Sequence, residues 1–249
     1  LYSFLFLITL GCLLWFTSRQ KNLPLNISDG FIITTMFWVV LAFAGSIPFY
    51  FFGLNANDAI FESVSGITTT GATVIVGLDE LPKSLLLYRQ LLQWIGGMGL
   101  IILAVAVMPT LGIGGGQLYK MELPGSHGNQ RLTPKITDSA KALWKIYFGL
   151  TIICALLYLL SGMNLFDAIA HSLSTVAGGG FSTHDDSIGF FDSGLIEAVC
   201  IIFMLLSAAS FAVHYAAIFG GKPLKYFYDS EFRFFLSVVI SIAIVILIF

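Results

Sequence analysis

Two short runs rich in glycine and hydroxyl side chains interrupt the long apolar segments of this chain. They are residues 65–73 (SGITTTGAT) and residues 174–182 (STVAGGGFS). Irregular backbone at the depth of a lipid bilayer is tolerated only where protein buries it or where it lines a water-filled cavity. Neither run is therefore part of an ordinary membrane-spanning helix, and each is a candidate ion-binding loop.

The composition indicates that a bilayer is the solvent for most of this chain. Hydrophobic residues make up 57% of it, charged residues only 10%, and the mean hydropathy is +0.90. A soluble domain has about 25% charged residues. We therefore predict an all-α polytopic membrane protein. The three cysteines lie inside apolar segments and no metal-ligand spacing occurs, so we expect neither a disulfide framework nor a covalently bound cofactor.

Six apolar segments are long enough, or nearly so, to cross about 30 Å of hydrocarbon. They cover about residues 1–17, 31–52, 85–111, 140–160, 195–219 and 232–249. Two further amphipathic segments, residues 58–66 and 166–175, are too short to cross, because each makes only about two and a half helical turns. We expect both to be re-entrant half-helices, each leading into one glycine-rich run.

The chain repeats itself at a constant offset of 109 residues. Residues 58–65 (DAIFESVS) align with residues 167–174 (DAIAHSLS), and Gly71 aligns with Gly180. The repeating unit is a span, a half-helix, a glycine loop and a second span. Because the number of spans from unit to unit is even, the copies run parallel about an axis along the membrane normal, which is the symmetry of a pore.

The repeat predicts the organisation of the chain. The chain starts at Leu1 inside an apolar segment and stops at Phe249 without a polar flank, so we expect a fragment of a longer polypeptide. The predicted parts are residues 1–30, an additional N-terminal transmembrane helix and linker; 31–116, the first pore repeat; 117–139, a cytoplasmic linker; 140–221, the second pore repeat; and 222–249, a linker and the first helix of a truncated third repeat.

The charged residues predict the orientation in the membrane. Ten of the twelve Lys and Arg residues lie on one side of the predicted spans, which identifies that side as cytoplasmic, and only Lys83 and Arg89 lie on the other. Nine of the fourteen acidic residues lie on the side of the glycine loops. The negative electrostatic potential of these acidic residues is expected to concentrate cations at the outer entrance of a pore. The alternative is that translocated loops merely lack basic residues.

The two loops have the chemistry of a site for a dehydrated monovalent cation. Backbone carbonyls can replace the hydration shell of K⁺ without placing a fixed charge in the bilayer, and glycine reaches the backbone angles that this requires. The negative end of each half-helix dipole points at its loop. Thr68, Thr69, Thr70 and Thr73 can bond to the loop backbone or offer hydroxyls at the entrance. The alternative is a pair of tight membrane turns in which glycine serves packing.

The repeat contains further charged and titratable residues whose roles the sequence does not decide by itself. Glu62 and His171 are equivalent in the two half-helices. A charge there is costly unless it is paired, so we expect them to support the loops rather than bind ions, with Arg89 as the partner of Glu62. We expect His184 and His214 to be interface or packing histidines.

Two glycine clusters remain. Residues 96–99 (GGMG) serve either close helix packing or a bend that lines the pore. Residues 112–116 (GIGGG) lack the Lys-Ser/Thr of a phosphate-binding loop, and we expect a helix terminator there.

Three motifs carry a resemblance to a known family. They are residues 61–73 (FESVSGITTTGAT), 88–99 (YRQLLQWIGGMG) and 179–185 (GGFSTHD). The chain resembles the Trk/Ktr/HKT superfamily of potassium transporters, most closely the membrane subunit of the bacterial Trk type, because the additional first span fits that type better than Ktr. The resemblance implies a pore of four non-identical repeats, potassium uptake across the bacterial inner membrane, loops that face the periplasm, a homodimer, and a cytosolic nucleotide-binding TrkA-like regulatory ring.

The resemblance also implies roles for individual residues, with K⁺ as the permeating ion, Na⁺ as a second candidate, and no nucleic acid. The implied selectivity filter is Thr70, Gly71 and Ala72 in the first repeat and Gly179, Gly180 and Phe181 in the second, with K⁺ bound at Thr70, Gly71, Gly179 and Gly180. The implied supporting residues are Thr68, Thr69, Thr73, Glu62, His171 and Arg89.

Two other classes of function remain open. An intramembrane serine protease would pair Ser63 or Ser65 with His171 or His214, but the repeat duplicates the serine-rich half-helix, whereas a catalytic site needs only one. A non-conducting membrane assembly subunit is the other alternative. We predict that the protein is not an enzyme.

Overall fold

The computed structural model describes residues 2–17, 27–99, 136–218, 220–221 and 224–248, and these contain helices, turns and loops but no β-strand. The all-α prediction is confirmed. The helices of the first half are α1 (Tyr2–Thr17), α2 (Ile27–Phe52), α3 (Ala56–Ile67) and α4 (Lys83–Gly97), with a short 3-10 helix η1 (Leu78–Glu80). Those of the second half are α7 (Ile136–Leu160), α8 (Leu165–Ala177), η3 (Ser187–Phe191), α9 (Gly194–Ser207), α10 (Phe211–Ile218), α11 (Lys225–Tyr228) and α12 (Ser230–Ile248).

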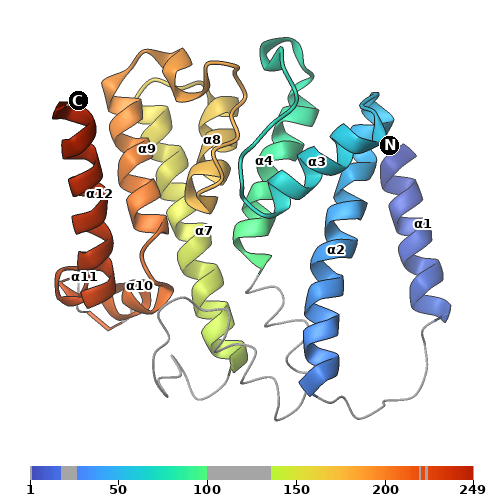
Figure 1. Cartoon of the computed structure of the whole chain (residues 1–249), viewed down its shortest axis with the longest axis horizontal. Coiled ribbons are helices and arrows are strands. Elements are labelled where there is room, and N and C mark those ends of the chain that lie inside the picture. The colour runs from blue at the N-terminus through green and yellow to red at the C-terminus, as the bar shows by residue number, and fades with distance from the viewer. Residues whose placement is uncertain (1, 18–26, 100–135, 219, 222–223, 249) are drawn as a thin grey trace.

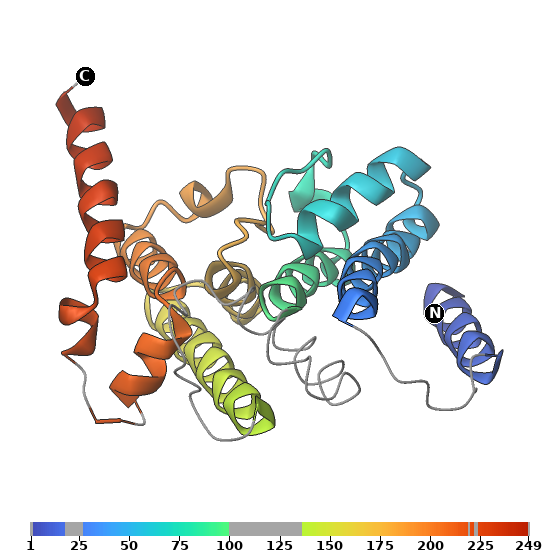
Figure 2. The same ribbon diagram turned by 60° about the horizontal axis from the view of Figure 1, so that its bottom comes forward.

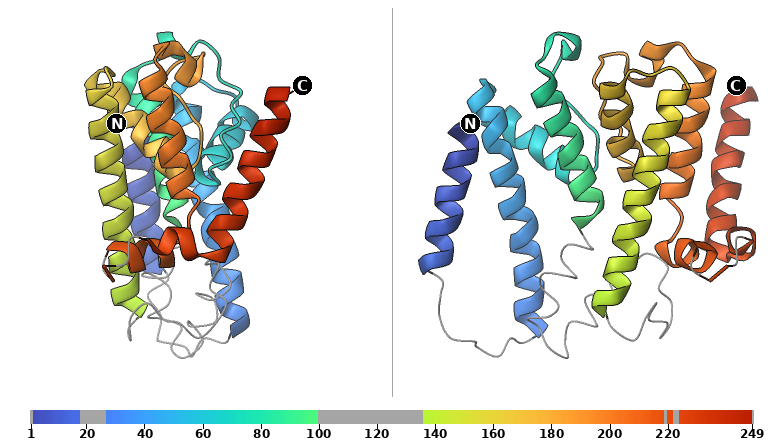
Figure 3. Two further views of the ribbon diagram at one scale, coloured as in Figure 1. Left: turned by 90° about the vertical axis from the view of Figure 1, so that its left-hand side faces the viewer. Right: turned by 180° about the vertical axis from the view of Figure 1, so that it is seen from behind.

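The two units of the sequence repeat stand side by side. In Figure 1 the first unit is α2, α3 and α4, and the second is α7, α8 and α9, with α1 and α12 at opposite edges. Figure 3 shows the same order from behind, with the short helices α3 and α8 at the same end of the molecule. The turned view of Figure 2 shows α12 at the edge beyond α10 and α11.

The same local signals begin the short helix in both units. Gly53 and Gly162 turn the chain after the preceding helix, with φ of 118° and 106°. Asn55 and Asn164 are the N-caps: each side-chain oxygen accepts a hydrogen bond of 3.0 Å from the backbone N–H three residues on. The sequence repeat is therefore also a repeat of turn and cap geometry.

Three helices of the described chain are long and apolar enough to cross a membrane. They are the segments Thr35–Phe52, Lys141–Leu160 and Ser230–Ile248. With 12 and 13 residues, α3 and α8 extend only roughly 18 to 20 Å and cannot cross it. Both therefore have the length expected of re-entrant half-helices.

Glycines at the end of α4 allow neighbouring segments to approach closely. A Cβ on Gly96 would overlap the backbone of Ile67 at the end of α3, and one on Gly97 would lie 2.7 Å from the Tyr147 hydroxyl oxygen. A Cβ on Gly99 would overlap the ring of Trp38. Of the two interpretations of residues 96–99, close packing is the one that these contacts support.

The fifth predicted span is wrong as a single helix. The apolar segment 195–219 is divided into α9 and α10 by a break at residues 208–210. The Ser207 hydroxyl donates to the Met204 carbonyl at 2.9 Å, and a ring nitrogen of His214 bonds to the Leu206 carbonyl at 2.9 Å. Both carbonyls also accept backbone N–H groups, from Ala208 and Ala209, so the last turn of α9 is closed by backbone and side-chain hydrogen bonds together.

Several predictions fall wholly or partly outside the described residues. The third predicted span, 85–111, is described only as far as residue 99, and the predicted terminator 112–116 and most of the linker 117–139 lie beyond it. Within the described residues, α7 of the second unit begins at Ile136.

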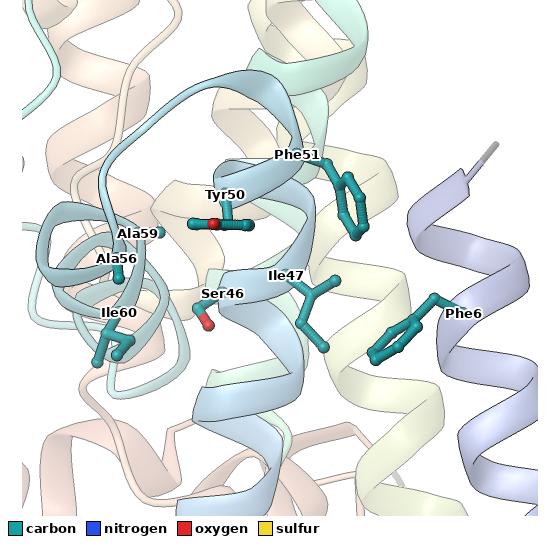
Figure 4. Close-up of a pocket in the computed structure, with 8 residues that line it drawn as sticks. All are labelled: Phe6, Ser46, Ile47, Tyr50, Phe51, Ala56, Ala59 and Ile60. Carbon is teal, nitrogen blue, oxygen red and sulfur yellow. The ribbon is translucent and has the colours of Figure 1, made fainter.

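An apolar groove of about 320 Å³ lies between α1, α2 and α3. Figure 4 shows Phe6 of α1, Ile47 of α2 and Ile60 of α3 among the side chains that line it. Among the described residues that line this groove there is no charged side chain and no residue of either glycine-rich loop. The groove is therefore separate from the candidate ion-binding loops.

Candidate functional site

The two glycine-rich loops have the same backbone conformation. We define the first loop as residues 68–77 and the second loop as residues 178–186. In the first, Thr69 and Gly71 have φ of 55° and 78°; in the second, the equivalent Gly178 and Gly180 have φ of 68° and 82°. Residues with a side chain rarely adopt such angles, so Gly71 and Gly180 meet a backbone requirement in both copies.

Each loop leaves its half-helix in the same way. The N–H of Thr70 donates to the Ser65 carbonyl at 2.9 Å, and the N–H of Gly179 donates to the Ser174 carbonyl at 3.0 Å. The C-terminal end of each half-helix thus runs directly into its loop, which puts the negative end of the helix dipole there.

The two loops touch each other at their glycines. A Cβ on Gly71 would overlap the carbonyl oxygen of Gly179 and lie 3.1 Å from its carbon, whereas a Cβ on Gly180 would meet no atom within 4 Å. Of the implied filter residues, Thr70, Ala72 and Gly180 are exposed, Gly71 is half-buried, and Gly179 and Phe181 are buried. The structure therefore brings both implied filter segments together.

Behind the first loop lies a buried ion pair. Arg89 of α4 places Nη2 2.7 Å from Oε1 of Glu62, and both side chains are at most 1% exposed. The Thr73 hydroxyl donates to Glu62 at 2.8 Å and accepts from Arg89 at 2.9 Å. The partnership of Glu62 with Arg89 expected from the sequence is present, and it holds Thr73 of the first loop.

Arg89 also contacts the second loop. Its Nη1 donates to the Ser182 carbonyl at 3.2 Å, and its guanidinium lies 4.3 Å from the ring centroid of Phe181. A cation over an aromatic face is attracted by the ring quadrupole. A single buried side chain of the first unit is thus bonded to both loops.

The second unit uses different residues at equivalent positions. His171 Nδ1 donates to the Asp167 carbonyl at 2.9 Å, which leaves Nε2 of the neutral ring to accept from the Ser182 hydroxyl at 2.9 Å. The pair His171–Ser182 occupies the place of Glu62–Thr73 in the first unit. Both pairs tie the half-helix to its own loop.

The remaining threonines bond locally. The hydroxyl of Thr68 donates to the Val64 carbonyl at 2.7 Å and lies 2.8 Å from the hydroxyl of Thr70. Thr68 therefore bonds to the end of α3, while Thr69 supplies one of the left-handed backbone angles.

Gln93 of α4 is a supporting residue to which the sequence alone assigned no role. Its Oε1 accepts hydrogen bonds from the Ser174 hydroxyl at 2.7 Å and from the backbone N–H of Phe181 at 3.0 Å. The available signal in the sequence was an uncharged polar residue within the apolar segment 85–111; the structure shows that its side chain is fully buried. Such residues at membrane depth need a partner.

His184 of the second loop joins the two units. Its Nδ1 bonds to Oδ1 of Asp79 in η1, and its Nε2 lies 3.1 Å from Oδ2 of Asp167 in α8. Next to it, Asp185 accepts hydrogen bonds of 3.0 Å from the backbone N–H groups of Gly77 and Leu78. His184 is thus an interface histidine, as the sequence predicts.

The charge state of His184 follows from these partners. Desolvation lowers the pKa of His184, but the hydrogen bonds to Asp79 and Asp167 outweigh it and raise the pKa above that of a free histidine. The hydrogen bond from His184 in turn lowers the pKa of Asp79. This contact between the units is therefore an ion pair when His184 is protonated.

In the described residues, the serine and histidine side chains that a serine protease would pair are not bonded to each other. Ser63 donates to the Ala42 carbonyl at 2.6 Å, His171 bonds to Ser182, and His214 bonds to Tyr226 and Leu206. Ser65 Oγ is buried without a hydrogen-bond partner in the described part of the chain. Neither candidate serine is bonded to a candidate histidine there.

Comparisons with known proteins agree with this geometry. The family model of TrkH, described as a cation transport protein, matches residues 1–249. The Trk system potassium uptake protein TrkH of Vibrio parahaemolyticus is 51% identical over 98% of this chain, and that of Escherichia coli K12 is 46% identical over 98%. The chain spans about half the length of the curated relatives it matches, 51% in both cases.

A solved structure matches as well. The crystal structure of the potassium transporter TrkH from Vibrio parahaemolyticus superimposes with a TM-score of 0.81 at 48% identity, over 98% of this chain and 50% of that one. The all-α architecture of re-entrant helices between spans is thus shared with a TrkH protein of known structure. The chain belongs to the TrkH family of cation transport proteins.

Proposed function

We propose that this chain contributes two repeats to the pore of a potassium uptake protein in the bacterial inner membrane. The observation that carries the proposal is the contact between two equivalent left-handed glycine loops, at Gly71 and Gly179. The relatives that match 98% of the chain bear the name of a potassium uptake protein, which supports potassium as the ion.

The proposed mechanism uses backbone rather than side-chain charge. K⁺ loses water as carbonyls of Thr70 and Gly71 in the first loop and Gly179 and Gly180 in the second replace its hydration shell. Ala72 and Phe181 complete the two filter segments. The ends of α3 and α8 direct partial negative charge at the loops, and Glu62 and Arg89 neutralise each other in the buried ion pair behind the first loop.

The proposal extends to orientation and partners. The loops face the periplasm, because their side carries nine of the fourteen acidic residues and few basic ones. The working transporter is a homodimer regulated by a cytosolic nucleotide-binding TrkA-like ring, and Na⁺ is the competing ion. Two further repeats complete the pore, in keeping with relatives about twice as long.

The test is ion selectivity in a full-length transporter that carries this sequence. Gly71→Ser and Gly180→Ser are reconstituted into liposomes, and K⁺ and Na⁺ uptake are measured separately. Both variants lower the ratio of K⁺ to Na⁺ uptake, because a side chain disturbs the carbonyl geometry. Gly189→Ser, in the exposed η3, is the control and keeps the wild-type ratio.

Two results would contradict the proposal. Unchanged ratios in both loop variants would show that these glycines do not select the ion. No K⁺ uptake by the wild-type protein would favour the non-conducting assembly subunit.

A further inference from the structure

Gln93 fixes the direction of one filter peptide through the planarity of the peptide bond. Its buried Oε1 accepts from the N–H of Phe181 at 3.0 Å. That N–H belongs to the peptide that joins Gly180 to Phe181, and the described chain contains no cis peptide. In a trans peptide the N–H and C=O point in opposite directions. The Gly180 carbonyl oxygen therefore points away from Gln93 and α4.

The chemistry of the contact fixes the orientation of the amide. A backbone N–H only donates, so the atom of Gln93 that faces Phe181 must be the oxygen. The Ser174 hydroxyl donates to the same oxygen at 2.7 Å. Both hydrogen bonds to Oε1 would be lost if the amide flipped, because the amide NH₂ would then face the N–H of Phe181, and both groups are donors.

Glycine is required where the amide passes the second loop. A Cβ on Gly179 would overlap the amide group of Gln93, and a Cβ on Gly71 would lie 3.7 Å from its Nε2. The amide of Gln93 therefore lies against both loops, with its oxygen bonded to the second and its nitrogen beside the first. Nε2 has no hydrogen-bond partner among the described residues.

Gln93 of the first unit supports the second loop, but the second unit has no glutamine at the equivalent position to support the first loop. The residue of α9 equivalent to Gln93 is Ile202, which is exposed and has no amide. The second loop thus depends on a side chain that the repeat does not duplicate.

We propose that Gln93 is a specificity-determining positioning residue, which holds the Gly180 carbonyl toward the ion path by accepting the N–H of Phe181. The inference rests on the proposed function, because it concerns the same filter. Without the acceptor, the Gly180–Phe181 peptide is free to rotate, and the second loop loses a fixed carbonyl that distinguishes K⁺ from Na⁺.

The experiment compares three variants in the full-length transporter. Gln93→Met keeps the length and removes the acceptor, and Gln93→Glu keeps an acceptor oxygen. Gln90→Met is the matched control, because Gln90 is an equally buried glutamine of α4 whose amide has no hydrogen-bond partner within the described chain. K⁺ and Na⁺ uptake into liposomes and the thermal stability of each purified protein are measured.

The expected result separates positioning from packing. Gln93→Met lowers the K⁺ to Na⁺ uptake ratio about tenfold, the change that loss of one hydrogen bond of typical strength produces. Gln93→Glu returns the ratio to within about twofold of the wild type, as an acceptor at the same place predicts. Gln90→Met keeps the wild-type ratio.

Other outcomes overturn the inference. It is wrong if Gln93→Met keeps the wild-type ratio, or if Gln93→Met and Gln90→Met lower it equally. Should Gln93→Met not reach the membrane, Gln93→Asn, whose amide is one methylene too short to reach Phe181, carries the same test. If no Gln93 variant folds while Gln90→Met does, Gln93 serves folding alone. A wild-type protein that takes up no K⁺ instead refutes the proposed function.

Discussion

Glu62 and Arg89 form an ion pair of 2.7 Å in which neither side chain is more than 1% exposed. Removing one partner of such a pair leaves an uncompensated buried charge, which costs about 3 to 5 kcal/mol. Glu62→Gln therefore lowers the unfolding temperature markedly, whereas Glu80→Gln, at an exposed acid of η1, leaves it unchanged.

A double variant tests whether the loss of stability comes from the unpaired charge or from the altered packing around it. Glu62→Met with Arg89→Met is expected to be less destabilised than Glu62→Gln alone, because no unpaired charge remains. Thermal unfolding in detergent measures all three. Equal stability of Glu62→Gln and Glu80→Gln would show that Arg89 does not depend on Glu62.

Gly71→Ala and Gly180→Ala differ in their predicted severity. Both residues have left-handed backbone angles, which cost a residue with a side chain about 1 to 2 kcal/mol. Only a Cβ on Gly71 would also overlap the Gly179 carbonyl. Gly71→Ala is therefore the less stable variant and the one with less selective K⁺ uptake. The opposite order would mean that the loops do not touch at Gly71.

The two N-caps predict a second asymmetry between the units. Asn55→Ala and Asn164→Ala each remove a cap, which typically costs about 1 kcal/mol. Asn164 also donates at 2.6 Å to the carboxylate of Asp167, which is buried, whereas the Asp58 bonded to Asn55 is only half-buried. Asn164→Ala is thus the more destabilising change, and chemical denaturation of the purified variants ranks them.

His184 predicts a pH dependence of stability. Its folded-state pKa is raised by Asp79 and Asp167, against an unfolded value of about 6.5. A raised pKa contributes stability that is complete below the unfolded value and is lost as the pH rises through the folded one. The unfolding temperature of the wild type therefore falls as the pH rises from about 6.5 through the folded-state pKa of His184.

The matched histidine variants test this assignment. His184→Gln removes that fall, and His214→Gln, at a histidine of α10 distant in sequence from both glycine-rich loops, keeps it. A wild type and a His184→Gln variant with parallel pH profiles would show that the bridge does not titrate in this range.

Much of the architecture follows from sequence periodicity and the repeat. The short half-helices, their loops and the pairing of Glu62 with Arg89 were predicted, because a charge on a short membrane helix needs a partner and Arg89 is one of two basic residues on that side. The break between α9 and α10 was not predicted, since the apolar segment continues through Ala208 and Ala209 without a helix-breaking Pro or Gly.

Contacts between the units were harder to predict than contacts within them. The 109-residue offset shows that Ser182 is equivalent to Thr73, but it carries no information about which residue of one copy meets which residue of the other. The bonds from Gln93 to Phe181 and from His184 to Asp79 depend on how the two units dock, which sequence spacing does not encode.

Because α4 supports the second loop through Arg89 and Gln93, while α9 carries Ala198 and Ile202 at those positions, the two copies have ceased to be interchangeable. A gene conversion that overwrote α4 with the sequence of α9 would remove both supports at once. The second loop therefore keeps these contacts only while α4 and α9 differ at the two positions, although the backbone angles of the two loops are alike.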